Sequence, residues 1–108
     1  STSRNEVATV KNYIYQHYEE DVNLEMLAEK VYLSSGYLSF IFKKETGEGL
    51  AQFIRKFRLE KAKELLNQGE KVYKVANQVG YQDLDYFNMK FKKYFNALPS
   101  DFHKDNNK

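Results

Sequence analysis

The amino-acid sequence predicts an all-α fold of about seven helices, with two helix-turn-helix units joined by a long helix. Apolar residues recur at three- and four-residue spacing along the chain, which is typical of amphipathic helices. No segment alternates as a strand does, and the only proline is Pro99. Two similar segments, 28–47 and 76–96, each contain a short apolar helix, a turn and a second helix with Phe-Lys-Lys. This repetition predicts one structural unit that occurs twice.

The first unit is expected at about residues 5–47. Its first helix, from Asn5 to Tyr18, has a stripe of apolar side chains. Two more helices follow, because cap-forming side chains precede two apolar segments and a glycine closes the second segment. The caps and the glycine are Asn23, Ser34 and Gly47.

The second unit is expected at about residues 72–104, after a linker helix from Leu50 to about Gln68. A helix from Val72 to Val79 begins this unit. The expected landmarks that follow are a turn at Gly80, a helix start at Asp83, a left-handed stop at Asn96 and a short last helix from Pro99.

Each turn between paired helices makes two demands on the sequence. A small side chain is needed where the helices approach most closely, and a residue with positive φ is needed in the turn. Ala76 and Gly80 meet both demands. In the first unit Ala28 is small, but Tyr32 stands at the position of the glycine. We therefore expect the first turn to be built differently.

Composition restricts the class of protein. The chain has 108 residues, of which 42% are hydrophobic and 30% charged, so we expect one folded domain. It contains no apolar run of the ~18 residues needed to cross a bilayer and no signal segment, so we expect a cytoplasmic protein without membrane contact. Cysteine is absent, and His17 and His103 lie far apart. We therefore expect neither a metal nor a cofactor.

A set of spaced motifs extends from residue 7 to 103. The motifs are Leu24-x-x-Leu27-Ala28, Leu33-Ser34, Tyr37-Leu38-x-x-x-Phe42-Lys43-Lys44-x-x-Gly47, Arg58-Leu59-x-x-Ala62-x-x-Leu65-Leu66, Val75-Ala76-x-x-Val79-Gly80-Tyr81-x-Asp83-x-x-Tyr86-Phe87-x-x-x-Phe91-Lys92-Lys93 and Pro99-x-x-Phe102. Together they resemble the DNA-binding domain of AraC/XylS-type transcription regulators. The sequence departs from the usual pattern at Asn96, Leu98 and His103, and Leu98 is expected to weaken the cap of the last helix.

The resemblance implies a homeodomain-like fold and a function in transcription regulation. The resemblance also implies that each helix-turn-helix inserts its second helix, about 35–46 or 83–95, into a major groove of double-stranded DNA. The linker of about 19 residues spans roughly 28 Å, close to the ~34 Å between successive grooves on one face of a duplex. We expect a monomeric isolated domain, RNA polymerase as a further partner, and an N-terminal sensing or receiver domain outside this chain.

Helical periodicity divides each recognition helix into a core face and a DNA face. The expected core residues are Leu38, Ile41, Phe42, Phe87, Phe91 and Tyr94. The candidate base-contacting residues are Ser35, Gly36, Ser39, Phe40, Leu84, Asp85, Asn88 and Met89. The candidate phosphate-contacting residues are Lys43, Lys44, Lys92 and Lys93. Asn88 suits adenine, Asp85 suits cytosine, and Phe40 or Met89 suits a thymine methyl group.

Other interpretations remain for these residues. Phe40 can be a boundary residue of the core, and Asp85 can stabilise the start of its helix. Tyr81 is expected to pack against the linker helix. The net charge of +2 does not by itself indicate DNA binding. The alternative function is a protein-interaction module on the same scaffold, whereas an enzyme is not expected because no partnered catalytic groups converge.

Overall fold

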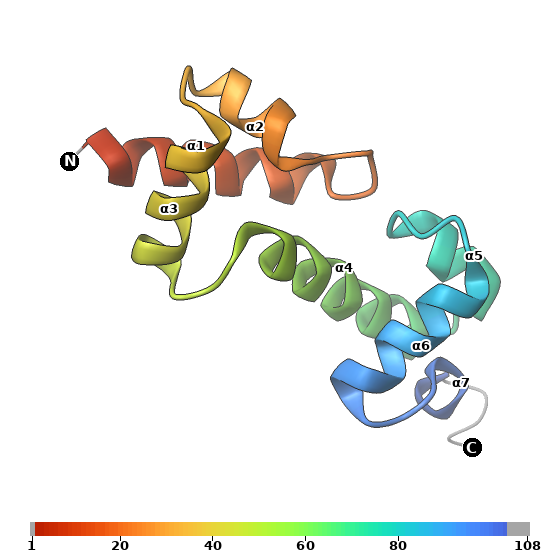
Figure 1. The fold of residues 1–108 in the computed structure, drawn as a ribbon. Helices are drawn as coiled ribbons and strands as arrows, with labels where there is room; N and C mark the ends of the chain where they lie inside the picture. The colour runs from red at the N-terminus through yellow and green to blue at the C-terminus, as the bar shows by residue number, and fades with distance from the viewer. Residues whose placement is uncertain (1, 104–108) are drawn as a thin grey trace. The chain divides into compact units, whose positions relative to one another are not determined.

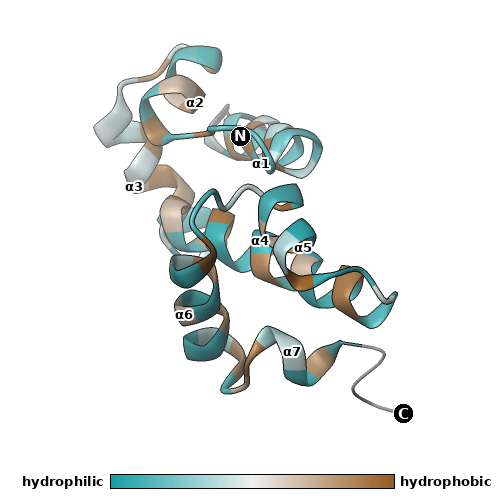
Figure 2. Ribbon diagram, turned by 90° about the vertical axis from the view of Figure 1, so that its right-hand side faces the viewer, coloured by the Kyte–Doolittle hydropathy of each residue, from teal (hydrophilic) through white to brown (hydrophobic). Residues whose placement is uncertain are grey.

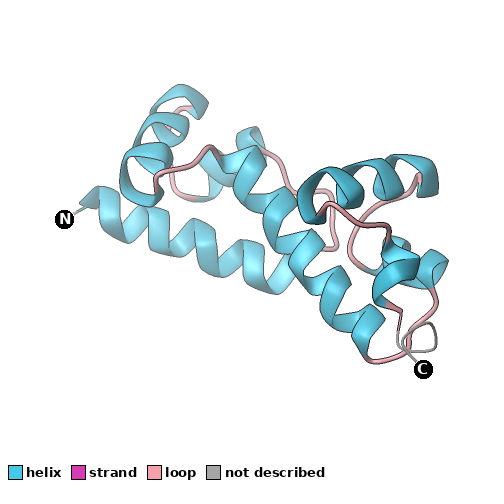
Figure 3. Ribbon diagram, turned by 90° about the horizontal axis from the view of Figure 1, so that it is seen from below, coloured by secondary structure: helices cyan, strands magenta, loops and turns pink. Residues whose placement is uncertain are grey.

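The computed structural model describes residues 2–103 and confirms the predicted all-α class. The helices are α1 (Thr2–His17), α2 (Leu24–Lys30), α3 (Ser35–Thr46), α4 (Leu50–Asn67), α5 (Val72–Gln78), α6 (Leu84–Phe95) and α7 (Pro99–Phe102), as Figure 1 shows. The described residues contain no strand (Figure 3). Predicted helix ends agree with the observed ones to within three residues.

The chain divides into two compact units, Ser1–Arg55 and Lys56–Lys108, which we call unit 1 and unit 2. Helix α4 begins in unit 1 and ends in unit 2. The predicted end of the second helix-turn-helix, at residue 104, lies outside the described residues. Each unit has its own apolar core, described separately below.

The core of unit 1 lies between α1, α2 and α3. Ile14, Leu27, Leu38 and Phe42 are fully buried there. The first turns of α4 extend this core, because the rings of Phe42 and Phe53 meet edge to edge with centroids 5.2 Å apart. Hydrophobic and hydrophilic positions succeed one another along the helices in Figure 2, and the buried residues of α1 are Val7, Val10 and Ile14. The predicted apolar stripes are therefore the faces that the helices bury.

The core of unit 2 is largely aromatic and centres on Phe91. Its ring lies 5.7 Å from Phe87, 4.6 Å from Phe95 and 5.7 Å from Phe102 between centroids. Tyr94 was predicted in this core, but its side chain is 43% exposed and its hydroxyl donates a hydrogen bond to Glu60 in α4. The prediction for Tyr94 is wrong because the half-buried Phe95 packs on Phe91 and Phe102 in its place, with ring centroids 4.6 and 5.8 Å away.

The predicted helix caps are confirmed. Asn23, Ser34 and Asp83 each accept a hydrogen bond from the backbone N–H three residues further on, at 2.9, 3.2 and 3.0 Å. The predicted left-handed stops are also present, with φ of 86° at Gly47 and 58° at Asn96. These residues set where both recognition helices begin and end.

The start of α7 is stabilised in a way that the sequence analysis did not foresee. Leu98 has no side-chain acceptor, as expected, but its N–H donates to the Asp101 carboxylate at 2.9 Å. Pro99 occupies the first helical position, where its fixed φ suits the helix. The cap is therefore supplied by the first turn of the helix itself.

The turns of the two helix-turn-helix units have the same backbone hydrogen bonds. Tyr32 has φ of 59° and Gly80 has φ of 102°. The bonds that close the turns are Leu33 N–H to Ala28 carbonyl at 3.0 Å, Tyr32 N–H to Glu29 at 3.2 Å, Tyr81 N–H to Ala76 at 2.8 Å and Gly80 N–H to Asn77 at 3.1 Å. This is the Schellman arrangement in both cases.

The prediction that the first turn would be built differently is therefore wrong. A non-glycine residue can adopt the left-handed conformation at a cost of about 1–2 kcal/mol. The side chain of Tyr32 is 94% exposed, so no packed neighbour opposes this conformation. The two turns differ in length instead, since one more residue separates Gly80 from the cap Asp83 than separates Tyr32 from the cap Ser34.

Candidate nucleic-acid interface

Helix α3 presents one face to solvent. Leu38, Ile41 and Phe42 are buried on its other face, as predicted. The candidate base-contacting residues Gly36, Ser39 and Phe40 are exposed, and Ser35 is half-buried. The Phe40 side chain is 63% exposed, which excludes its interpretation as a boundary residue of the core.

Helix α6 presents an equivalent face in unit 2. Phe87 and Phe91 are buried, whereas Asp85 is exposed and Asn88 is half-buried. Two apolar candidates are also exposed, Leu84 at 41% and Met89 at 56%. The solvent-facing side of α6 thus offers a carboxylate, an amide and apolar surface side by side.

The two recognition helices match position by position when they are counted from their caps. The cap Ser34 corresponds to Asp83, and each cap is bonded to the N–H of a tyrosine three residues later. The candidate base-contacting positions then pair as Ser35 with Leu84, Gly36 with Asp85, Ser39 with Asn88 and Phe40 with Met89. The scaffold is the same in both units, and the exposed chemistry differs except at the last pair, where both residues are large and apolar.

The surface of α3 is open at Gly36. A Cβ atom placed on this glycine would meet no atom within 4 Å. The glycine is therefore not required by packing within the chain. It leaves the α3 backbone uncovered, so that a ligand can approach it closely.

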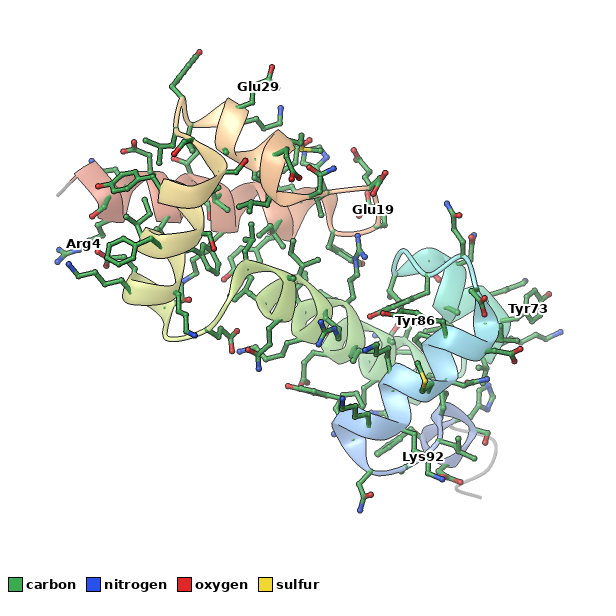
Figure 4. All side chains as sticks on the ribbon, in the orientation of Figure 1. Arg4, Glu19, Glu29, Tyr73, Tyr86 and Lys92 are labelled. Atoms are coloured by element: carbon green, nitrogen blue, oxygen red, sulfur yellow. The ribbon has the colours of Figure 1, made fainter. Side chains whose placement is uncertain are left out.

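Four lysines follow the candidate base-contacting residues. Lys43, Lys44, Lys92 and Lys93 lie in the last turns of α3 and α6 and are exposed. Lys92 is labelled on α6 in Figure 4. Within the described part of the chain no ion pair engages these four side chains. Their charges favour the carboxyl ends of the helices and also suit contact with phosphates.

The sequence analysis missed two residues on α6. Tyr86, labelled in Figure 4, is 45% exposed, and the Lys90 ammonium lies 5.3 Å from the centre of its ring. Lys90 occupies the position at which α3 has the buried Ile41. A position-by-position comparison of the two helices would have identified this added charge.

The prediction for Tyr81 is confirmed. Its side chain is buried, and the Arg58 guanidinium of α4 lies 6.0 Å from the centre of its ring. Its ring also lies 5.3 Å from that of Phe87 on the recognition helix. Tyr81 therefore helps to hold α6 in place within unit 2.

Charge is distributed unequally between the units. Unit 1 has six basic and eight acidic residues, a formal charge of −2, whereas unit 2 has eleven and seven, a formal charge of +4. The net charge of +2 for the whole chain conceals this difference. Acidic side chains of unit 1 gather on α2 and in the loop before it, at Glu19, Glu20, Asp21, Glu25 and Glu29.

Comparison with known proteins identifies the family. A model described as a helix-turn-helix domain, of the AraC type, matches residues 27–105, most of the chain. The chain belongs to the AraC-type helix-turn-helix family. It is 32% identical over 106 residues to the Msm operon regulatory protein of Streptococcus mutans, covering 97% of this chain and 38% of that protein. The chain spans about two fifths of the length of the curated relatives it matches first.

Solved structures share the AraC-type fold. The C-terminal domain of the two-component response regulator yesN from Fusobacterium nucleatum is 40% identical, with a TM-score of 0.83 over 88% of this chain and 94% of that one. The DNA-binding domain of AdpA, solved with a target DNA, has a TM-score of 0.84 over 89% of this chain and 87% of that one. At 24% identity this second likeness shows the fold alone.

These findings settle the general class of function. The chain is a DNA-binding domain of the kind used in transcription regulation, and the alternative as a protein-interaction module is not favoured. Its family and fold are those of DNA-binding regulators and not of enzymes. Among the described helices, none combines the length and apolarity needed to span a bilayer.

Proposed function

We propose that both units bind the same DNA duplex, with α3 and α6 in successive major grooves. The observation that supports this most directly is the match between the two helices. Each has a side-chain cap with the same hydrogen bond, buried anchors at the same positions and an exposed face opposite them. A helix with a buried face and a polar, open face suits insertion into the groove.

The length of α4 supports the use of two grooves. Its 18 residues form one uninterrupted helix that begins in unit 1 and ends in unit 2. At 1.5 Å per residue it is about 27 Å long. That length is similar to the ~34 Å from one major groove to the next on the same face of DNA.

Base contacts would come from the exposed positions of the two helices. In unit 2, Asn88 would bond the N6 and N7 edge of adenine, and Asp85 would accept from cytosine N4. In unit 1, Ser39 is the polar counterpart of Asn88, and Gly36 leaves the backbone open beside it. Ser35 and Leu84 would contact bases from the first positions of their helices. The set contains no arginine, so DNA shape would contribute to the preferred sequence.

Phosphate contacts would come from Lys43, Lys44, Lys92 and Lys93, which lie one to two turns after the base-contacting positions. Neutralising phosphates releases counterions and makes affinity dependent on salt. These contacts would position the helices without selecting a sequence. Because unit 2 carries the positive charge of the chain, it would supply more of this attraction than unit 1.

The remaining parts of the regulator lie outside this chain. We propose an N-terminal receiver or sensing domain, because several relatives that match over nearly the whole chain are response regulators and are much longer. RNA polymerase is the proposed partner in transcription. The isolated domain is proposed to bind its site as a monomer, since one chain already carries two recognition helices.

Selection of binding sites from a random duplex pool tests the proposal. One enriched site with two half-sites is expected. Asn88→Ala should relax selectivity in one half-site by about 5- to 150-fold, the effect of a lost bidentate base contact. Ser39→Ala should act in the other half-site only.

Asn12→Ala, which removes an exposed amide on α1, is the matched control and should change neither half-site. Enrichment of a single short motif, affected by only one of the two substitutions, would contradict the proposal.

A further inference from the structure

Phe40 and Met89 are exposed apolar side chains at equivalent positions in the middle of the two recognition helices. Phe40 is 63% exposed on α3 and Met89 is 56% exposed on α6. Within the described part of the chain neither takes part in an aromatic or cation–π contact. Leaving so much apolar surface in water is unfavourable in proportion to its area. The same arrangement occurs in both units, so each helix offers an apolar side chain at the same place to whatever it binds.

The caps and buried anchors fix where these two side chains point. Phe40 lies six residues after the cap Ser34, and Met89 lies six residues after the cap Asp83. On α3 the anchors Leu38 and Phe42 flank Phe40, and both are fully buried. A helix held by its cap and by two buried residues cannot rotate about its axis.

The anchors of α6 correspond to those of α3. Phe87 and Phe91 are fully buried and flank Met89 at the same spacing. The apolar side chain of each unit therefore occupies the same place on its own recognition helix. This equivalence concerns each unit by itself and needs no knowledge of how the two units are placed.

The major groove offers only one apolar group to such a side chain. Guanine, cytosine and adenine present hydrogen-bond donors and acceptors there, whereas thymine also presents its C5-methyl group. Neither a phenyl ring nor a thioether can satisfy the donors and acceptors of the other bases. The neighbours Ser39 and Gly36 are uncharged and small, so they leave room for a base beside the ring.

We infer that Phe40 and Met89 each cover a thymine methyl group, so that both half-sites carry a thymine at the same position relative to their recognition helix. This inference rests on the proposed function of α3 and α6. It assigns the same base preference to two helices whose polar side chains differ. The two half-sites are then similar at this thymine and dissimilar at the bases that Asn88 and Asp85 contact.

Replacement of thymine by deoxyuridine in the selected site tests the inference, because it removes the methyl group and leaves every hydrogen-bonding atom in place. For the wild-type domain, deoxyuridine at the thymine opposite Phe40 should weaken binding about fourfold, the value of one buried methyl group. In the Phe40→Ala variant the same replacement should have no effect. Met89→Ala should abolish the effect in the other half-site only.

Tyr73→Ala is the control, because Tyr73 is a 58% exposed aromatic residue on α5, outside the recognition helices. This variant should keep the full sensitivity to deoxyuridine in both half-sites. Thermal melting of the free variants establishes that each one is folded.

Deoxyuridine that binds as tightly as thymine at every position, or a full penalty that persists in both Phe40→Ala and Met89→Ala, would overturn the inference. The proposed function would still stand in those cases. Its own failure would be recognised separately, as a wild-type domain that selects no sequence.

Discussion

Units 1 and 2 share the same helix-turn-helix backbone, but they have glycine at different positions of positive φ. Unit 1 has it at the end of the recognition helix, and unit 2 has it in the turn. In unit 1 the turn has Tyr32 and the recognition helix ends at Gly47, whereas in unit 2 the turn has Gly80 and the helix ends at Asn96. All four residues have positive φ. The geometry of the crossing helices therefore requires the left-handed conformation, and the residue type only sets its cost.

The units differ more in charge than in architecture. Unit 1 carries −2 and unit 2 carries +4, although each places two lysines at the end of its recognition helix. Long-range attraction to phosphates depends on the summed charge, while base contacts depend on a few local side chains. We therefore expect unit 2 to contribute more of the long-range attraction to DNA than unit 1, while both units make base contacts.

The largest effect is expected from enlarging the alanine at the close approach of the paired helices. Ala28 and Ala76 are each 2% exposed, so replacing either by leucine forces its helices apart and should cost about 1–3 kcal/mol. Denaturant unfolding of the two variants measures the loss. Wild-type stability in either variant would mean that the helices of that unit do not meet at the alanine.

Replacing the turn residue should change the stability of the two units in opposite directions. Gly80→Ala should destabilise unit 2 by about 1 kcal/mol, because alanine is strained at positive φ. Tyr32→Gly should stabilise unit 1 by about 0.5–1 kcal/mol, since the relief of strain exceeds the added chain entropy. Thermal unfolding followed by circular dichroism reports both values. A Tyr32→Gly variant that loses stability would show that Tyr32 is held by contacts and not merely tolerated.

The salt dependence of DNA binding tests whether both units contact phosphates. Lys43→Ala and Lys92→Ala should each reduce the slope of log affinity against log salt by about one. Both should weaken binding to specific and unrelated sequences alike, because phosphates carry no sequence information. Titrations at several salt concentrations measure the slopes. If only Lys92→Ala changes the slope, unit 1 makes no phosphate contact through Lys43.

The smallest effect on stability is expected at Gly36, whose counterpart in unit 2 is Asp85. Gly36→Ala should stabilise α3 by about 0.5 kcal/mol, because alanine favours the helix and its Cβ meets no neighbour. DNA affinity should fall at the same time, since the methyl group would stand between the α3 backbone and the groove. Calorimetric melting and a mobility-shift titration report the two quantities. Increased stability with unchanged affinity would place Gly36 away from DNA.

The sequence predicted the parts of the fold that local rules control. Caps such as Ser34 and Asp83 and buried anchors such as Phe42 and Phe91 follow from side-chain chemistry and helical periodicity. Tyr94 was misplaced because the choice between it and Phe95 depends on Phe102, a contact that periodicity does not encode.

The errors at the turn and in the charges also have physical causes. The prediction for the turn at Tyr32 is wrong because an exposed tyrosine can adopt positive φ in place of a glycine. The charge difference between the units could not be predicted, because it depends on where unit 1 ends. That boundary follows Arg55 and lies inside the continuous helix α4. The roles of the eight base-contacting and four phosphate-contacting candidates remain predictions until DNA binding is measured.

The central proposal is that one chain uses both recognition helices on one duplex, and a change in the spacing of the half-sites tests it most directly. Inserting ~5 base pairs between the half-sites turns the second one to the opposite face of the DNA. Affinity should then fall to that of a duplex with a single intact half-site, while the same insertion outside the site should have no effect. Unchanged affinity after the internal insertion would show that only one of the two helices binds DNA.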